Sequence, residues 1–293
     1  MPRFPPSRGR RFPNGRELTT VTGMLTIAHL SDTHLGQVHG GDGGKRARRR
    51  AELVMAYLDA LPGPLDGVLV TGDLTDHGLP GEYRQVAEAL TSRHPVLVCP
   101  GNHDSRGPYR EVLLGEAAGE RPAEVSAVSR AEPSAEGPIN RLHQLPGADV
   151  LMLDSSIPGR DDGLLDAETL DWLDTRLAAG RAELPALVAF HHPPVELHLP
   201  MVDGIRQFGE ADLAAVLRRH PRVAALLCGH SHTAAATTFA GLPLLVAPGV
   251  VSTVTLPCEG GSGISFDQPP MLAFHVLDGD GRLTTHYRVV PVD

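Results

Sequence analysis

The segment Leu25-Thr26-Ile27-Ala28-His29-Leu30 is an apolar run that is followed at once by Ser31-Asp32-Thr33-His34. Four more apolar runs, at residues 68–70, 96–99, 186–190 and 223–228, also end in polar groups suited to metals. Those groups are Gly72-Asp73, Gly101-Asn102-His103-Asp104, His191-His192-Pro193 and Gly229-His230-Ser231-His232. In an open α/β sheet, ligands gather outside the carboxyl ends of the strands. The sequence therefore predicts buried strands that deliver Asp, Asn and His side chains to one edge.

Strands and helices alternate through the first half of the chain. Apolar side chains at helical spacing predict helices at residues 46–61 and 82–90, which gives a βαβαβ run with parallel strands and right-handed crossovers. A strand at 149–153, a helix at 166–179 and a βα pair at 186–220 follow. After residue 223 the short apolar segments 234–240, 242–247, 271–277 and 283–290 predict an antiparallel meander. We expect an α/β fold with two packed sheets and helices outside them.

Two segments stand apart from this pattern. Residues 1–22 are rich in Arg and Pro and contain no apolar block, so we expect a disordered basic tail rather than a signal sequence. Residues 105–145 show little periodicity and predict an insertion or a long loop next to the site. The remainder, residues 23–293, is expected to form a single domain.

The composition excludes several classes of partner. A formal net charge of −9 argues against binding to duplex nucleic acid, although it does not exclude small anionic substrates. No apolar run approaches the length of a membrane span, so no membrane partner is expected. The 3 cysteines form no recognisable framework and no secretion signal is visible, which predicts a cytoplasmic location.

The polar blocks together supply enough donors for more than one metal. These donors are Asp32, His34, Asp73, Asn102, His191, His230 and His232. One metal takes about four to six donors, so this set suits two metals that share one bridging ligand. The mixture of oxygen and nitrogen fits Mn, Fe or Zn better than Ca or Cu. Two divalent ions with two carboxylates leave a charge of about +2, and such a pair can hold a hydroxide and clamp a phosphoryl oxygen.

The spacing of the donors is also informative. Asp32 and His34 are two residues apart, as are His230 and His232, so each pair faces one side if its strand continues. Glycines stand directly before Asp73, Asn102 and His230, where they permit tight turns and close backbone approach.

These blocks resemble the calcineurin-like metallophosphoesterase superfamily. The motifs Asp32-x-His34, Gly72-Asp73, Gly101-Asn102-His103-Asp104, His191-His192-Pro193 and Gly229-His230-x-His232 occur in the family's order across residues 31–232. Asp32-Thr33-His34-Leu35 and the segment 72–78 further resemble the class III cyclic-nucleotide phosphodiesterase branch, which also contains glycerophosphodiesterases. The resemblance implies a four-layer αββα sandwich of two mixed sheets flanked by helices.

The resemblance also implies a role for each donor. One metal would bind Asp32, His34, Asp73 and His232, and the other would bind Asp73, Asn102, His191 and His230. Asp73 would then bridge two ions that are commonly Mn and Fe, with Zn in some members. His103 would contact the phosphate and protonate the leaving alkoxide, which is worth about 10²–10⁴-fold in rate. His103, Asp73 and Asn102 are thus the expected catalytic residues, and either Asp104 or Asp76 would orient His103.

The other histidines have less specific patterns. Only the His-x-Pro pattern selects His191 over His192 as the ligand, and His192 is expected to face away from the metals. His29 is expected in the core or behind the ligands. His39 and His198 are expected at the surface in loops near the site, with contact to substrate as the alternative.

We therefore expect a metal-dependent phosphodiesterase that hydrolyses 3′,5′-cyclic nucleotides to 5′-monophosphates, with a bridging hydroxide as the nucleophile. Its partner is a small phosphodiester, and the resemblance is compatible with a homodimer. One alternative is an enzyme of the same fold that acts on other phosphodiesters, including glycerophosphodiesters, or on phosphomonoesters. A metal-free scaffold is the alternative from another class, and the complete set of donors argues against it.

Overall fold

The structure, a computed structural model, describes residues 24–116, 137–260 and 263–292. The tail predicted at residues 1–22 lies outside the described residues.

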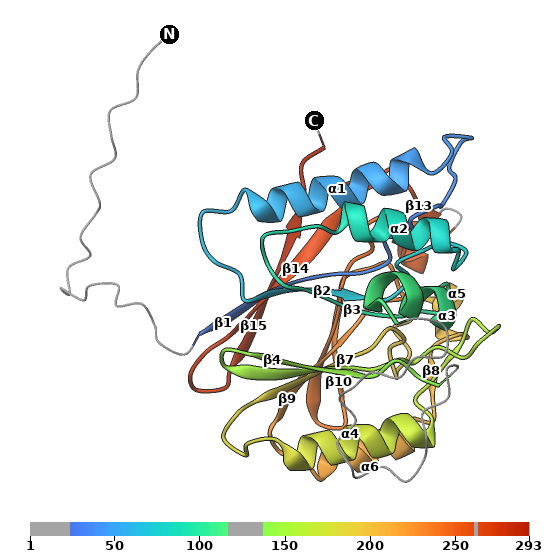
Figure 1. The fold of residues 1–293 in the computed structure, drawn as a ribbon. Helices are drawn as coiled ribbons and strands as arrows, with labels where there is room; N and C mark the ends of the chain where they lie inside the picture. Colours follow the sequence, from blue (N-terminus) through green and yellow to red (C-terminus); the bar gives the residue numbers. More distant parts are fainter. Residues whose placement is uncertain (1–23, 117–136, 261–262, 293) are drawn as a thin grey trace, which may run out of the picture.

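The first sheet is mixed. Strands β1 (Leu25–Leu30), β2 (Gly67–Thr71) and β3 (Val96–Cys99) pair in parallel, as the alternation of strands and helices predicts. Strand β14 (Met271–Leu277) runs antiparallel to β1, and β15 (Leu283–Val289) runs antiparallel to β14. Helices α1 (Lys45–Asp59) and α2 (Pro80–Ala89) cover the outer face of this sheet (Figure 1).

The second sheet is also mixed and has the order β10-β11-β9-β7-β5-β4. Its parallel centre is formed by β11 (Leu242–Val246), β9 (Val223–Cys228), β7 (Ala186–Ala189) and β5 (Ala148–Met152). The edge strands β10 (Ala235–Phe239) and β4 (Arg141–Leu145) run antiparallel to their neighbours. Helices α4 (Ala167–Ala179) and α6 (Glu210–Arg218) lie on its outer face (Figure 1).

The layers follow from the two-residue alternation of side chains along the strands. On β1, Leu25 and Ile27 pack into the core between the sheets, whereas Ala28 and Leu30 pack under the helices. A third core lies between the second sheet and its helices. The predicted α/β fold, a four-layer αββα sandwich of two mixed sheets, is confirmed (Figure 1).

Short elements fill the loops. They are β6 (Gly163–Leu164), α5 (Pro200–Asp203), β8 (Gln207–Phe208), β12 (Thr253–Val254), the 3₁₀ turn Pro257–Glu259 and β13 (Ile264–Ser265). Strands β12 and β13 pair with each other as a small separate ribbon.

The prediction of one antiparallel meander after residue 223 is wrong. Strand β11 pairs in parallel with β9, while β10 takes the edge and reverses into β11 through Ala240-Gly241. Both turn residues have positive φ, 51° and 84°, which suits a tight hairpin. The β14–β15 hairpin belongs to the other sheet. An apolar pattern specifies that a strand is buried, but it does not specify which strand lies beside it.

The segment 105–145, predicted as an insertion or long loop, carries regular structure at both ends. Helix α3 (Arg106–Tyr109) continues into a π-helical turn, Arg110–Leu114, and β4 forms the edge of the second sheet. Tyr109 is fully buried, so this end is part of the core. Residues 117–136 of the segment lie outside the described residues.

Among the described residues, no helix has both the length and the apolar character needed to cross a bilayer.

Candidate metal centre

The carboxyl ends of β1, β2, β3, β7 and β9 meet where the two sheets face each other. Hydrogen bonds join the sheets there: His191 Nδ1–H donates to the Thr71 carbonyl at 2.6 Å, and Val250 N–H, just after β11, donates to the Ser31 carbonyl at 3.0 Å. The polar residues that follow each strand are therefore held in one place by the ends of rigid elements.

A first group of side chains gathers around Asp73. Asp32, His34, Asp73 and His232 place their ligand-type atoms within 4.8 Å of one another. His34 Nε2 lies 3.4 Å from Asp73 Oδ2 and 3.2 Å from His232 Nε2. His232 Nε2 in turn lies 3.4 Å from Asp32 Oδ1.

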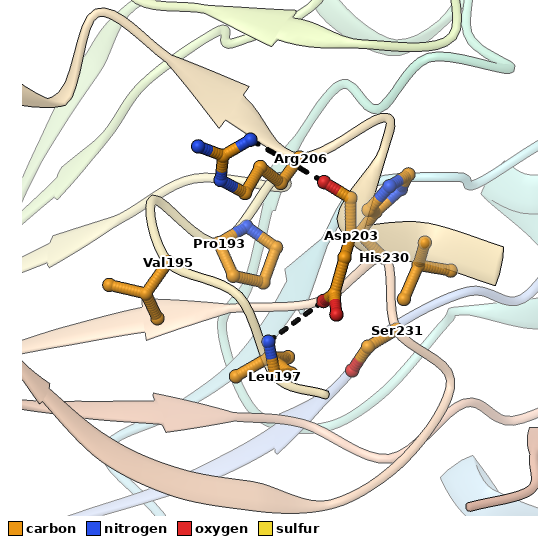
Figure 2. Close-up of a pocket in the computed structure, with 8 residues that line it drawn as sticks. Pro193, Val195, Leu197, Asp203, Arg206, His230 and Ser231 are labelled. Carbon is orange, nitrogen blue, oxygen red and sulfur yellow. Dashed lines mark hydrogen bonds between the residues drawn. The ribbon is translucent and has the colours of Figure 1, made fainter. Parts of the chain in front are cut away.

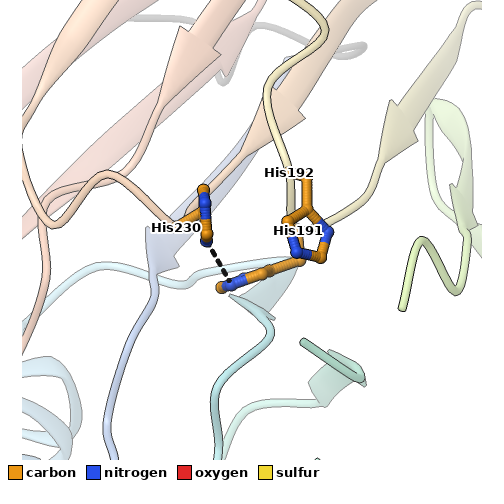
Figure 3. Close-up of side chains that lie close together, drawn as sticks. All are labelled: His191, His192 and His230. Atoms are coloured by element: carbon orange, nitrogen blue, oxygen red, sulfur yellow. Dashed lines mark hydrogen bonds between the residues drawn. The ribbon is translucent and has the colours of Figure 1, made fainter. Parts of the chain in front are cut away.

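A second group of side chains approaches the same carboxylate. His191 Nε2 is 3.4 Å from Asp73 Oδ2 and 3.3 Å from His230 Nδ1 (Figure 3). Asn102 lies between two residues that approach Asp73, since His103 N–H donates to Asp73 Oδ1 at 3.0 Å and Gly101 adjoins it. Asp73 is thus common to both groups.

His192 lies beside this group, but both of its ring nitrogens contact other protein groups. Its Nδ1 is 2.8 Å from the Ser155 hydroxyl, and its Nε2 is 3.2 Å from the Asp161 carbonyl. His191, by contrast, has its Nε2 next to Asp73 and His230 (Figure 3). A ligand-type atom of His192 nevertheless lies within 4.8 Å of those of His191 and His230, so the expectation that His192 faces away from the metals stays a prediction.

The imidazoles are fixed from behind by hydrogen bonds at Nδ1. His191 Nδ1–H donates to the Thr71 carbonyl at 2.6 Å, and His34 Nδ1–H donates to Asp76 Oδ1 at 3.0 Å. His232 Nδ1 lies 2.7 Å from the Ser252 hydroxyl. Such bonds set the tautomer and leave Nε2 with a lone pair for a cation.

Sequence reasoning missed Thr71 and Ser252. A signal was present for Ser252, because it is a polar residue a few positions after the end of β11, the strand next to β9.

Several buried atoms at the centre have no hydrogen-bond partner among the described residues. They are both carboxylate oxygens of Asp32, Asn102 Oδ1 and His230 Nε2. Buried polar atoms are nearly always paired, because an unpaired one costs about 1–3 kcal/mol. When His34 Nε2 carries no proton, it and Asp73 Oδ2 are two acceptors that face each other, and a cation between them would stabilise both. The residues present therefore fit metal ions, with a mixture of oxygen and nitrogen donors typical of transition metals.

The backbone is strained at the same residues. Positive φ values occur at Asp32 (57°), His34 (40°), Asp73 (48°), His230 (68°) and His232 (52°). A left-handed conformation is uncommon outside glycine, and its clustering marks functional sites. The strand does not continue through Asp32 and His34, since β1 ends at Leu30, yet both side chains lie at the centre, where their backbone has left-handed conformations.

Two glycines permit the close approach of the sheets, as predicted. A Cβ on Gly101 would lie 2.3 Å from Asp73 Oδ1, and one on Gly72 would lie 2.4 Å from His191 Nδ1. Any side chain at either position would displace a residue of the centre.

Burial and charge shape the ionisation of the centre. Burial raises the pKa of Asp32 to about 6. Burial also opposes the ionised form of Asp73, but His191 and His34 outweigh it and hold the pKa of Asp73 well below its ordinary value. Burial lowers the pKa of His232 to about 3, so this imidazole is neutral at pH 7. For His191 the Asp73 carboxylate outweighs burial and raises the pKa to about 9, so a metal must displace a proton there.

His103 differs from the other histidines of the centre because it is exposed. Its Nδ1–H donates to the Asp76 carbonyl at 2.8 Å, and its ring lies 4.7 Å from that of His34. Asp104 instead accepts from Leu74 N–H, Gly101 N–H and the Tyr83 hydroxyl. Of the two residues that the sequence left open, Asp76 is therefore the one that orients His103.

A crevice lies on the outer side of His230 (Figure 2). Asp203 ties its wall together, because its carboxylate accepts from Leu197 N–H at 2.8 Å and its carbonyl accepts from Arg206 at 3.5 Å. The crevice leaves no room for a water molecule, so the loop 193–206 acts as a wall behind His230.

Comparison with known proteins places this geometry in context. Residues 25–234 match the family Calcineurin-like phosphoesterase. A protein of Rhodococcus erythropolis named probable cyclic nucleotide phosphodiesterase is 33% identical over 80% of this chain and 74% of its own. The glycerophosphodiester phosphodiesterase GpdQ of Enterobacter lignolyticus is 30% identical over 87% of this chain and 88% of its own. Among solved structures, a dimetal phosphatase from Danio rerio has the same fold, with a TM-score of 0.61 at 16% identity over 91% of this chain and 99% of its own.

Proposed function

This chain belongs to the calcineurin-like phosphoesterase family and is a hydrolase of phosphoric diesters, and from that premise we propose that it opens 3′,5′-cyclic nucleotides to 5′-monophosphates at a dinuclear metal centre. The observation that carries the proposal is the position of Asp73 Oδ2. This one oxygen lies 3.4 Å from Nε2 of His34 and 3.4 Å from Nε2 of His191, as a ligand shared by two ions requires.

The proposal assigns the ligands in two sets. Asp32, His34 and His232 would hold one ion with Asp73, and Asn102, His191 and His230 would hold the other with Asp73. The unpartnered atoms of Asp32, Asn102 and His230 support this assignment. The donor set suits Mn, Fe or Zn, and we propose Mn and Fe as the usual pair.

The chain's own residues then carry the proton chemistry. When bound, such ions polarise a phosphoryl oxygen and lower the pKa of water. Asp73 and Asn102 orient the centre, and Asp73 Oδ1 also fixes the His103 backbone N–H at 3.0 Å. His103, held at Nδ1 by the Asp76 carbonyl, protonates the departing ribose 3′ oxygen, which is a poor leaving group.

The choice of cyclic nucleotides rests on the relative of Rhodococcus erythropolis, which bears that activity in its name. The relative of Enterobacter lignolyticus supports glycerophosphodiesters as the second candidate. The exposed free thiol of Cys258 supports a reducing, cytoplasmic location.

A substrate panel tests the proposal. Purified protein loaded with Mn is assayed with 3′,5′-cyclic AMP, glycerophosphoglycerol, bis-(p-nitrophenyl) phosphate and p-nitrophenyl phosphate. We expect the highest kcat/KM for cyclic AMP and a much lower value for the monoester. A preference for glycerophosphoglycerol would replace the cyclic-nucleotide assignment with the second candidate, and a preference for p-nitrophenyl phosphate would overturn the assignment as a diesterase.

A further inference from the structure

A second cavity opens beside the metal centre, between the loop that follows His34 and the β12–β13 ribbon. Its volume is about 300 Å³, and this size lies within the range of small-molecule pockets. It is lined by His39, Thr255, Gly260, Ile264, Ser265, Phe266 and Asp267. None of these residues is needed to hold the proposed metals.

One wall of the cavity is an aromatic platform formed by His39 and Phe266. Their rings stack with centroids 4.3 Å apart and planes inclined by 27°. The Arg46 guanidinium lies 5.4 Å from the Phe266 ring centroid, and it also donates to the carbonyls of Phe266 and Val251. Asp42 fixes the other half of the platform, since it accepts from the backbone N–H groups of His39 and Arg46. The platform is therefore already formed.

Only a few residues separate the cavity from the metal centre in the sequence, which limits the distance between them. Ser252 contacts His232, and Thr255 of the cavity is three residues further on, which limits their separation to about 11 Å. His39 follows His34 by five residues, a span of at most about 18 Å. Within these limits, a substrate whose phosphate sits at the metals can reach this cavity with its other end.

We propose that this cavity binds the nucleobase of the substrate, with the His39 ring, backed by Phe266, as its stacking surface and Asp267, Thr255 and Ser265 as its polar contacts. The inference rests on the proposed function, and it deepens that function by naming the residues that select a base. Stacking on aromatic side chains accepts any base, while the Asp267 carboxylate favours bases that present an N–H group.

The charges around the cavity argue against two other kinds of ligand, a second phosphate and a quaternary ammonium group. A second phosphate is disfavoured because Asp267 supplies a negative charge. A quaternary ammonium head group would need the face of Phe266, but Arg46 already places a cation against that ring. A planar base carries no negative charge for Asp267 to repel, and it can stack on the face of His39 that Phe266 does not cover.

The test compares substrates that differ only outside the phosphodiester. Wild type, Phe266→Leu and the matched control Val38→Ala are assayed with 3′,5′-cyclic AMP, glycerophosphocholine and glycerophosphoglycerol. Val38 is an exposed apolar residue next to His39, and it does not line the cavity. We expect Phe266→Leu to raise KM for cyclic AMP about tenfold, with kcat unchanged and no rise in KM for glycerophosphoglycerol. Val38→Ala should behave as wild type with all three substrates.

The outcomes separate the two proposals. Turnover of cyclic AMP by the wild type with equal KM changes for all substrates, or with none, overturns the base subsite and leaves the proposed function standing. A KM increase confined to glycerophosphocholine shows that the platform binds an amine instead, which also overturns it. Failure of the wild type to hydrolyse any cyclic nucleotide while it hydrolyses glycerophosphoglycerol overturns both.

Discussion

The metal centre and the pair His29–His275 are both clusters of buried imidazoles. They differ in whether all of their buried polar atoms have hydrogen-bond partners. In the pair, His29 Nδ1 lies 3.0 Å from His275 Nε2. The outer nitrogens bond to hydroxyls, His29 Nε2 to Thr71 at 2.9 Å and His275 Nδ1 to Thr285 at 2.8 Å. Every ring nitrogen of this pair has a protein partner, whereas the metal centre leaves atoms of Asp32, Asn102 and His230 without one.

The backbone separates the two clusters in the same way. His29 and His275 lie in regular, paired positions of β1 and β14. At the metal centre, by contrast, Asp32, Asp73 and His230 hold positive φ values. A fully hydrogen-bonded network on unstrained strands is typical of a core. Unpaired polar groups on a strained backbone indicate a bound ligand whose interactions offset the loss of stability. Burial of histidine alone does not distinguish a core from a site.

The largest effect that we expect follows from replacing the shared carboxylate. Asp73→Asn removes the charge next to both His34 and His191, so both ions should be lost. Activity should fall by at least about 10³-fold, because the ions supply several kcal/mol of transition-state stabilisation. Elemental analysis of the purified variant, alongside its rate with cyclic AMP, measures both results.

The matched control for this variant is Asp174→Asn. Asp174 is half-buried on α4, on the outer face of the second sheet, where it pairs with Arg219 and His220, so metal content and rate should match wild type. Retention of two ions per chain in Asp73→Asn would show that Asp73 does not bridge.

His103 offers a smaller but more selective test. His103→Ala should keep both metals and lower kcat for cyclic AMP by about 10²–10⁴-fold, since the 3′ oxygen then leaves unprotonated. The loss should shrink with bis-(p-nitrophenyl) phosphate, whose leaving group needs no proton. His286→Ala, an exposed histidine on β15, serves as the control. An equal loss with both substrates would contradict the role of His103 as an acid.

The correctly predicted parts of the centre are those that depend on short, local stretches of sequence. An apolar run followed by Asp, Asn or His is visible in a few residues, and parallel strands bring their ends together. The packed cores and the choice of helices follow from the same periodicity. This is why the αββα fold and the convergence of the five blocks were predictable.

The missed features depend on partners that are far apart in the sequence. His29 and His275 are separated by 246 residues, and no pattern near either one names the other. The Thr71 carbonyl that holds His191 belongs to the backbone, which every residue shares. The left-handed turns at Asp32 and His34 arise from tertiary contacts, because these residue types do not require positive φ.

The smallest expected effect concerns the core pair and is seen in stability rather than in activity. Burial lowers the pKa of His275 from 6.5 to about 3, so the folded protein keeps this ring neutral while the unfolded chain protonates it below pH 6.5. The free energy of unfolding therefore falls as the pH falls, by about 2 kcal/mol from this group between pH 6.5 and about pH 5.

His275→Gln keeps a donor and an acceptor beside His29 but removes this titration. Its free energy of unfolding should therefore fall by about 2 kcal/mol less than that of wild type when the pH is lowered from 6.5 to about 5. Urea unfolding followed by the fluorescence of Trp172, the 1 tryptophan of the chain, measures the free energy at each pH. The histidines of the metal centre are common to both proteins and cancel in the difference. His286→Gln, a substitution at an exposed position of β15, should keep the wild-type slope. If His275→Gln also kept that slope, His275 would be accepting protons in the folded state, and the contrast between a satisfied neutral pair and an unsatisfied metal centre would not hold.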